Sequence, residues 1–288
     1  MKPNELYLNQ SKQFWAYVRS ISQEVGYTVP KRKQIKVPSV GEMVEALRKL
    51  DLDSTRIVDE TEEPTPLGGA LRDYFVYRAS VLNTDVEPQL QDKDRARMLF
   101  DKVRAAGECS CPLPMNKQKD AMKAHAFFTG VVNMLIESNT EGMPCDFDPK
   151  RLTTFTLDGA PLRTLARRVD GAFPSHVDTV AIWEIKEYYY TTTFGSRVAD
   201  GVYESLLDGM ELEELYEKEK RKVLHYLMVD GHFTWWESGG RPYLCRIVDM
   251  LHMGYVDEVL FGAEVIERLP SLVKEWVVQE KKNQRAVK

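Results

Sequence analysis

The stretch RVDGAFPSHVDTVAIWEIKE, residues 168–187, decides the fold that this sequence predicts. A turn near Pro174 to Asp178 separates two apolar runs, which indicates two strands that pair side by side. Side chains alternate across a strand, so Glu184 and Lys186 share one face of the second run. Ionised groups in an apolar strand are costly unless they are paired or bind a metal. This pair therefore marks a candidate functional site.

The register of the two strands selects a partner for Glu184. If the turn is centred at residues 176–177, facing residues have numbers that sum to about 353, which places Asp170 opposite Trp183–Glu184. Adjacent strands lie roughly 5 Å apart, so the two carboxylates converge. Asp178 is closer in sequence, but the extended strand between it and Glu184 spans roughly 20 Å. Two converging carboxylates form a hard oxygen site suited to Mg²⁺ or Mn²⁺.

The segments on either side of these strands predict a mixed α/β core. Residues 117–137 are apolar almost all round at their centre, as expected of a helix buried inside a domain. Residues 223–229 predict a strand buried on both faces, which favours a central place in the sheet. An exposed helix is predicted at 211–222, and a last helix at 265–279 with a break at Pro270. The order from residue 117 is helix, three strands, helix, strand and helix: residues 117–137, 152–157, 165–173, 179–193, 197–207, 223–229 and 243–251.

This order, with Val169-Asp170-Gly171 on one strand and Trp183-Glu184-Ile185-Lys186 on the next, resembles the PD-(D/E)xK nuclease superfamily. That superfamily includes most type II restriction endonucleases and many repair nucleases, and its common core is a helix, three strands, a helix and a strand. The resemblance covers residues 116–288 and implies a restriction endonuclease-like core, in which helices flank a central mixed β-sheet. Val169 departs from the pattern, because proline is frequent at that position. The position contributes backbone geometry rather than chemistry.

The resemblance also implies roles for individual residues. In the superfamily the aspartate and the glutamate hold Mg²⁺ with help from the backbone carbonyl between glutamate and lysine. Carried over to this chain, Asp170, Glu184 and the carbonyl of Ile185 are the metal ligands, and Mn²⁺ is the other candidate ion. Lys186 would orient or polarise the attacking water. Asp170, Glu184 and Lys186 are therefore the expected catalytic residues.

Other polar side chains near this set are alternatives or candidate contacts. The sequence leaves open whether one or two ions bind, and whether Glu137 or Asp178 joins the site. A basic cluster from Lys31 to Lys36 is a possible phosphate contact. Three arginines that precede the Asp170 strand or begin the helix after the third strand are candidate nucleic-acid contacts: Arg167, Arg168 and Arg197.

The composition is that of an ordinary globular protein. The 288 residues are 43% hydrophobic and 29% charged, and the formal charge of -5 gives no general attraction to nucleic acid. Any polyanion contact therefore needs a local basic surface. A secretory signal and a membrane-length apolar run are not recognisable, so a cytoplasmic protein without a membrane partner is expected. Cys109-Ser-Cys111 has no second ligand pair at metal spacing, which favours reduced structural thiols over a zinc site.

Two regions are predicted along the chain. Residues 1–115 read as a helical region for target recognition or dimerisation, in which Ser39 is expected to cap a helix at 42–50. Residues 116–288 are expected to form the nuclease core with its C-terminal helices.

The predicted function is metal-dependent hydrolysis of phosphodiester bonds by a DNA endonuclease of restriction or phage-defence type. Double-stranded DNA is the expected partner, bound by a homodimer or within a multi-protein defence system. One alternative is a DNA repair or recombination nuclease. Another is a non-catalytic DNA-binding or interaction domain that keeps the nuclease fold.

Overall fold

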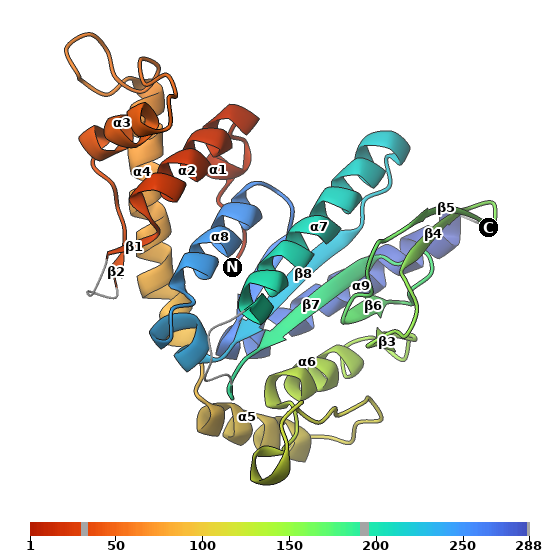
Figure 1. The fold of residues 1–288 in the computed structure, drawn as a ribbon. Helices are drawn as coiled ribbons and strands as arrows, with labels where there is room; N and C mark the ends of the chain where they lie inside the picture. Colours follow the sequence, from red (N-terminus) through yellow and green to blue (C-terminus); the bar gives the residue numbers. More distant parts are fainter. Residues whose placement is uncertain (30–33, 191–195, 287–288) are drawn as a thin grey trace.

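In the computed structural model the chain folds around a five-stranded mixed β-sheet with helices on both faces (Figure 1). The structure describes residues 1–29, 34–190 and 196–286, except for the side chains of residues 121, 196, 197 and 286. Antiparallel pairing joins β3 to β6 and β6 to β7, and parallel pairing joins β7 to β8 and β8 to β9. The mixed α/β class is thereby confirmed. In sheet order the strands are β3 (Asp146–Phe147), β6 (Gly171–Phe173), β7 (Ala181–Glu187), β8 (Leu224–Asp230) and β9 (Glu258–Phe261).

The two longest strands, β7 and β8, lie at the centre of the sheet. Their sequences, AIWEIKE and LHYLMVD, are almost wholly buried. Parallel strands that are covered on both faces need such near-continuous apolar runs. The prediction of a central strand at 223–229 is confirmed, because β8 lies between β7 and β9.

Helices cover the two faces of the sheet in separate groups. Trp183 of β7 stacks on Trp276 of α9 (Val265–Ala286), with ring centroids 5.5 Å apart. The core cluster on that face also includes residues of α5 (Lys93–Ala105) and α6 (Phe127–Glu137). The opposite face carries α7 (Ser196–Glu219) and α8 (Arg241–His252), which pack on β8 and β9. Because side chains alternate along β7, Glu184 points away from Trp183 and toward α7.

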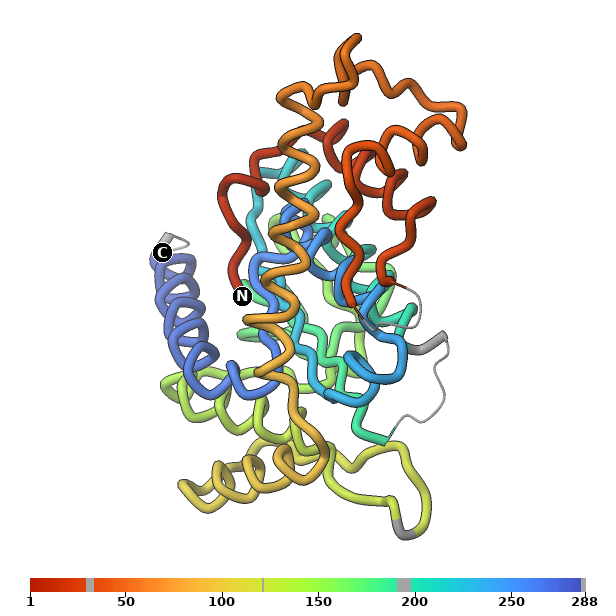
Figure 2. The backbone as a smooth tube through the Cα atoms, turned by 90° about the vertical axis from the view of Figure 1, so that its left-hand side faces the viewer, coloured from red at the N-terminus to blue at the C-terminus, as the bar shows by residue number. Residues whose placement is uncertain are grey.

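The N-terminal region is helical and has a hydrophobic cluster of its own. Ser39 accepts a hydrogen bond from the Glu42 backbone N–H, and Glu42 completes a capping box, so the predicted N-cap is confirmed. Figure 2 shows α4 running from this region along the core toward α5. The elements are α1 (Glu5–Leu8), α2 (Lys12–Val25), β1 (Thr28–Val29), β2 (Gln34–Ile35), α3 (Val40–Lys49) and α4 (Pro66–Val81).

Short helical turns complete the described elements. They are η1 (Leu82–Val86), η2 (Glu87–Gln89), η3 (Asp120–Met122), η4 (Phe233–Glu237) and η5 (Gly262–Glu264). In the part of the chain that the structure describes, every helix is too short or too polar to cross a membrane.

The strand predicted at 152–157 forms, but it lies outside the main sheet. It is β4 (Thr154–Leu157), which pairs with β5 (Ala160–Thr164) in a separate hairpin and contacts the turn before β7 through a single bridge from Thr154 to Val177. Asp158 and Gly159 both have positive φ, which is the backbone conformation of a tight two-residue hairpin turn. The prediction overlooked this Asp-Gly signal and with it β5, and of the strand predicted at 165–173 only residues 171–173 form a strand, which is β6. The first strand of the sheet is instead β3, which is too short to show a pattern.

Further differences concern the C-terminal half. The helices predicted at 197–207 and 211–222 are one helix, α7, and β9 was not predicted. The break expected at Pro270 is wrong, because α9 continues through it. Pro270 lies near the start of that helix, and it removes one backbone hydrogen bond. The strand predicted at 179–193 is β7 over seven residues, and 191–193 lie outside the described residues.

Candidate functional site

The pairing of β6 with β7 brings Asp170 and Glu184 together. Gly171 faces Trp183, so the next residue pair outward is Asp170 with Glu184. The Asp170 backbone N–H donates to Glu184 Oε1 at 3.1 Å, and the Ile185 N–H donates to Asp170 Oδ2 at 2.8 Å. The predicted register is confirmed to within one residue, and the more distant Asp178 was rightly set aside as the facing residue.

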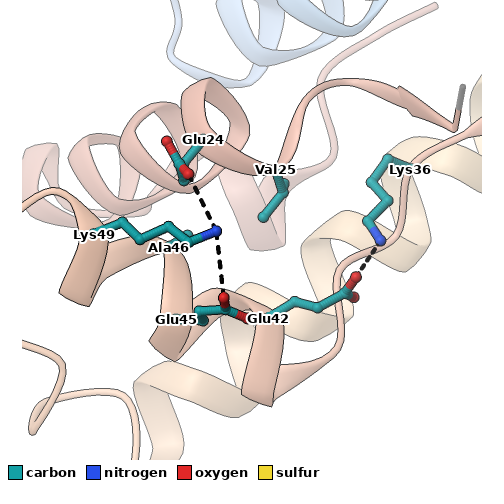
Figure 3. A pocket seen from close by; sticks show the side chains of 7 residues that line it. All are labelled: Glu24, Val25, Lys36, Glu42, Glu45, Ala46 and Lys49. Atoms are coloured by element: carbon teal, nitrogen blue, oxygen red, sulfur yellow. Dashed lines mark hydrogen bonds and ion pairs between the residues drawn. The ribbon is translucent and has the colours of Figure 1, made fainter.

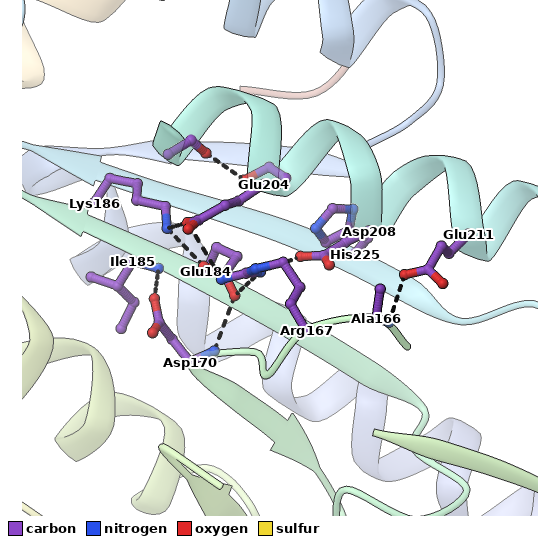
Figure 4. A network of polar contacts seen from close by, with 12 residues as sticks. Ala166, Arg167, Asp170, Glu184, Ile185, Lys186, Glu204, Asp208, Glu211 and His225 are labelled. Carbon is purple, nitrogen blue, oxygen red and sulfur yellow. Dashed lines mark hydrogen bonds and ion pairs between the residues drawn. The ribbon is translucent and has the colours of Figure 1, made fainter. Parts of the chain in front are cut away.

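Lys186 lies on the same face of β7 as Glu184, beneath α7. Its Nζ donates to Glu184 Oε2 and to Glu204 Oε2, each at 2.8 Å (Figure 4). The Glu184 side chain has no exposed surface, and that of Lys186 is 9% exposed. The three predicted catalytic residues therefore lie within one connected group of polar contacts.

Arg167 adds a second cation to this group from the segment that precedes β6. Its Nη1 lies 2.8 Å from Glu184 Oε1 and 2.6 Å from Asp208 Oδ2, and its Nη2 donates to Glu184 Oε2 at 3.1 Å. The sequence suggested Arg167 as a nucleic-acid contact, whereas here it is held by carboxylates. The arginine side chain is 21% exposed, so it lies at the edge of the group.

Two acidic residues of α7 complete the cluster, and sequence reasoning missed both. Glu204 and Asp208 are one helical turn apart, so their side chains share the helix face that lies over β7. Asp208 is fully buried, and its Oδ1 has no hydrogen-bond partner among the described residues. The same holds for Nε2 of His225, which Figure 4 shows close to Asp208. The i,i+4 spacing was a usable signal, but only with the path of α7 across the sheet known.

Burial and charge set the protonation of the cluster. Burial and the neighbouring Glu184 raise the pKa of Asp170 to about 6, although Lys186 opposes them. Burial likewise raises the pKa of Asp208 to about 7, against the effect of Arg167. Burial alone would raise the pKa of Glu184, but Lys186 and Arg167 outweigh it and the pKa is lowered. Burial would lower the pKa of Lys186, yet Glu184 and Asp170 raise it, so the lysine is cationic at neutral pH.

The charges of the cluster do not balance when every group is ionised. Four carboxylates face two cations, which leaves an excess of two negative charges. A buried site with such an excess, and with Asp170 and Glu184 side by side, suits one divalent cation with oxygen ligands. The described residues therefore fit the ion that the sequence suggested.

The lone pairs of the Glu184 carboxylate are, however, already occupied by protein donors. A carboxylate offers about four lone-pair directions. Those of Glu184 are taken by the Asp170 N–H, by Lys186 and by both terminal nitrogens of Arg167. An ion can bind Glu184 only if one of these donors moves, and Arg167 is the most exposed of the side chains involved.

The other predicted residues lie elsewhere or outside the description. Glu137 accepts hydrogen bonds from Ser110, and Asp178 contacts Thr156 and Arg221, so these described contacts do not include Asp170 or Glu184. Arg168 is exposed on the segment before β6. The side chain of Arg197 lies outside what the structure describes.

The basic cluster suggested at Lys31 to Lys36 is described only in part, since residues 31–33 lie outside the described chain. Lys36 lines a pocket of the N-terminal region and pairs with Glu42 (Figure 3). Across that pocket Lys49 lies 3.3 Å from Glu45 and 3.5 Å from Glu24. Each lysine of this pocket thus has an acidic partner, and a role in phosphate contact stays a prediction.

Fold and site together define a mixed α/β protein with a buried acidic cluster at the centre of its sheet. The chain belongs to the family described as Domain of unknown function (DUF7687), whose model matches residues 91–276. Residues 1–85 match a second model, described as Domain of unknown function (DUF7690). No curated protein and no solved structure matches the chain. The two matches divide the chain between residues 85 and 91, whereas the division predicted at 115/116 stays a prediction.

Proposed function

We propose that this chain is a metal-dependent nuclease of the PD-(D/E)xK type that hydrolyses phosphodiester bonds in DNA. The observation that carries the proposal is the contact between Asp170 and Glu184 on paired strands, with Lys186 two residues further along the same face. The order of the elements that form the main sheet and its adjoining helices, α6, β3, β6, β7, α7, β8, supports it, because it follows the helix, three strands, helix and strand of the restriction endonuclease-like core, with the β4–β5 hairpin inserted after β3.

Asp170, Glu184 and the backbone carbonyl of Ile185 would hold Mg²⁺ or Mn²⁺. A bound ion of this kind lowers the pKa of a water ligand and neutralises charge on the phosphate. Lys186, cationic and held on the same face of β7, orients the attacking water and stabilises the charge that grows on the phosphate oxygens. Asp170 has a pKa of about 6, so it is largely ionised and able to bind an ion at neutral pH.

Arg167 has a second position in this mechanism. Ion binding at Glu184 requires that Arg167 leave the carboxylate, and a guanidinium released at the edge of the site can pair with a phosphate in two parallel hydrogen bonds. Arg167 therefore blocks the metal ligand in the metal-free protein and contacts the DNA backbone in the loaded one. This deepens the sequence-based suggestion of a nucleic-acid contact.

The type of nuclease is part of the proposal. We favour a restriction or phage-defence endonuclease that acts on double-stranded DNA, as a homodimer or with partner proteins. The separate hydrophobic cluster of the N-terminal region supports a distinct task for it, such as target recognition or dimer contacts. A repair or recombination nuclease uses the same chemistry and differs in its substrate.

A specific observation favours a rival function. The four contacts of Glu184 form a closed ion-pair network that needs no metal, as in a domain that keeps the nuclease fold only to bind DNA or protein. The excess of negative charge counts against this rival, because a purely structural network gains nothing from unbalanced buried carboxylates.

Cleavage assays separate these functions. Supercoiled plasmid, linear double-stranded DNA and single-stranded DNA are incubated with the protein in Mg²⁺, Mn²⁺ or EDTA. Cleavage with the metals and none with EDTA is expected, and Asp170→Asn, Glu184→Gln and Lys186→Met each lower it by at least about a hundredfold.

Glu187→Gln is the matched control, because Glu187 is a half-buried carboxylate on the opposite face of β7, where it accepts hydrogen bonds from Thr129. It is expected to cleave like the wild type. Metal-dependent cleavage that persists undiminished in Glu184→Gln would rule out the proposed site, and metal-independent DNA binding without cleavage would favour the rival.

A further inference from the structure

A second group of metal-ligand side chains lies apart from the acidic cluster, where the loop before α6 folds back on the end of that helix. Cys109 and Cys111 come from the loop, and Glu137 is the last residue of α6. One ligand atom from each of the three lies within 4.8 Å of the other two. Ligands of one tetrahedral ion have this kind of spacing, since zinc binds thiolate sulfur at roughly 2.3 Å and carboxylate oxygen at roughly 2.1 Å.

Hydrogen bonds keep the three groups facing one another. The Ser110 backbone N–H donates to Glu137 Oε2 at 3.0 Å, and the Ser110 hydroxyl also donates to this carboxylate. Ser110 therefore ties the middle of the Cys-Ser-Cys turn to Glu137 and places a sulfur on either side of it. The Cys111 backbone N–H and thiol also hydrogen-bond to this carboxylate, so an ion that replaces the thiol proton lies between the Cys111 sulfur and Glu137.

A pocket of 510 Å³ opens beside this group and is lined by Cys111 and Glu137. Its lining also includes Cys145 and Asp146, and none of its lining residues is a lysine, arginine or histidine. Asp146 is paired with His176 from outside this lining, whereas the described contacts of Glu137 include no basic side chain. Such a surface attracts a cation, and its sulfur atoms favour a soft or borderline ion over Mg²⁺.

We propose that Cys109, Cys111 and Glu137 bind one Zn²⁺ ion, with the fourth coordination position open toward the pocket. The ion fastens the loop between α5 and α6 to the end of α6. Two thiols and one carboxylate supply the tetrahedral set that zinc accepts from proteins. This site is independent of the proposed nuclease chemistry and shares no residue with it.

Binding at this site is coupled to proton release. Burial, Glu137 and Cys109 together raise the pKa of the Cys111 thiol, so the thiol is protonated in the metal-free protein at neutral pH. Zinc binds the thiolate, and each coordinating cysteine gives up its proton to solvent. The sulfur–metal bond forms as the S–H bond breaks, with no change of oxidation state.

Cobalt titration of the reduced full-length protein tests the proposal. After treatment with EDTA and a phosphine reductant, one Co²⁺ per chain is expected to bind through thiolate sulfur, in addition to any Co²⁺ at the proposed nuclease site. The visible spectrum should show tetrahedral bands and a thiolate-to-metal band in the near ultraviolet, and Zn²⁺ should abolish both. Cys109→Ser and Cys111→Ser lose the thiolate band, whereas Cys245→Ala keeps it, because Cys245 is buried on α8 away from this group.

A stability measurement covers the case in which a cysteine variant folds poorly. Zn²⁺ at about 100 times its Kd should raise the Tm of the wild type by roughly 5 °C, with little change in Glu137→Gln. Asp170→Asn keeps the cobalt spectrum, so failure of the nuclease proposal leaves this result unaffected. Absence of the thiolate band in the reduced wild type at excess Co²⁺, or its persistence in Cys111→Ser, would overturn the zinc site.

Discussion

At the scale of single residues, Glu184 is the central member of the candidate site, because both cations of the cluster contact it. It is fully buried and accepts hydrogen bonds from two side chains and one backbone N–H. Its ionised form is stable there only because Lys186 and Arg167 face it, and their charges outweigh the cost of burial. The residue that is proposed to bind metal is thus held in part by Arg167, the cation that the metal must displace.

Arg167→Gln tests this competition. Without the guanidinium, Glu184 has free lone pairs, so Mn²⁺ affinity measured by calorimetry is expected to rise about tenfold or more. DNA cleavage is expected to fall, because the phosphate contact is lost. Arg163→Gln is the control, since Arg163 pairs with Glu211 and Glu214 next to the cluster. A lower Mn²⁺ affinity in Arg167→Gln would show that the arginine supports metal binding rather than competing with the ion for Glu184.

Asp170→Asn has an effect that depends on pH in the metal-free protein. The folded-state pKa of about 6 lies above the ordinary value of 3.8, so ionising Asp170 is costlier in the folded than in the unfolded protein. The contribution of Asp170 to the free energy of unfolding is therefore greatest below about pH 4, and it is lost as the pH rises through about 6. Asparagine removes that loss, and Asp170→Asn is expected to be more stable than the wild type at pH 8 by up to about 3 kcal/mol.

Urea denaturation at pH 4.5 and pH 8 measures this difference, which should shrink at the lower pH. Asp178→Asn is expected to change the stability at pH 8 in the opposite direction. Burial raises the pKa of Asp178, but hydrogen bonds from Thr156 and the Arg221 charge outweigh it and the pKa is lowered. Asp178→Asn should therefore be less stable than the wild type at pH 8. Equal effects of the two substitutions at both pH values would contradict the electrostatic account of the site.

At the scale of elements, the position of α7 over β7 assembles the cluster. Gly209 lets this helix approach the segment before β9, because a Cβ at this position would lie 2.4 Å from the Tyr255 carbonyl oxygen. Glycine in a helix interior normally lowers stability. Its presence here indicates that the close packing of α7 stabilises the fold by more than the lost helix propensity costs.

Gly209→Ala is expected to lower the free energy of unfolding by about 2 kcal/mol, since the clash with backbone outweighs the helix propensity gained. The same substitution at Gly41 of α3, where a Cβ would meet no atom within 4 Å, should raise stability by about 0.5 kcal/mol. Chemical denaturation of both variants measures the contrast. A stabilised Gly209→Ala would mean that α7 and the segment before β9 are not in contact.

At the scale of the whole molecule, a buried ion pair joins the N-terminal region to the core. Arg78 of α4 pairs with Asp249 of α8 at 3.0 Å, and the Tyr74 hydroxyl donates to the same carboxylate. Arg78 is 1% exposed, so the pair is removed from solvent. The regions that match two separate families therefore share a polar contact that neither can satisfy alone.

Asp249→Ala leaves the Arg78 charge buried without its carboxylate. A loss of about 3–5 kcal/mol in unfolding free energy is expected, measured by urea denaturation. Asp101→Ala, which removes one side of the exposed Arg97–Asp101 pair, should change stability by less than about 0.5 kcal/mol. A small effect of Asp249→Ala, with the two regions unfolding separately, would show that the ion pair does not couple them.

Local pattern predicted the elements that hold the site. Alternation along β7 and the turn after Phe173 were enough to place Glu184, Lys186 and Asp170 together, because strand pairing follows a fixed spacing once the turn is known. The same reasoning failed at β4, where a two-residue turn redirects the strand into its own hairpin. It also missed β3 and β9, which are too short for a pattern to emerge.

The sequence by itself determined the mixed α/β class and the three residues at the centre of the candidate site. Only the tertiary structure decided their surroundings: Arg167 on Glu184, the acids of α7 above it, and Cys109 and Cys111 against Glu137. The physical reason is the separation along the chain between the residues that interact. Strand register acts between chain neighbours and leaves a periodic trace, whereas the path of a helix or loop across a sheet depends on packing that no local pattern records.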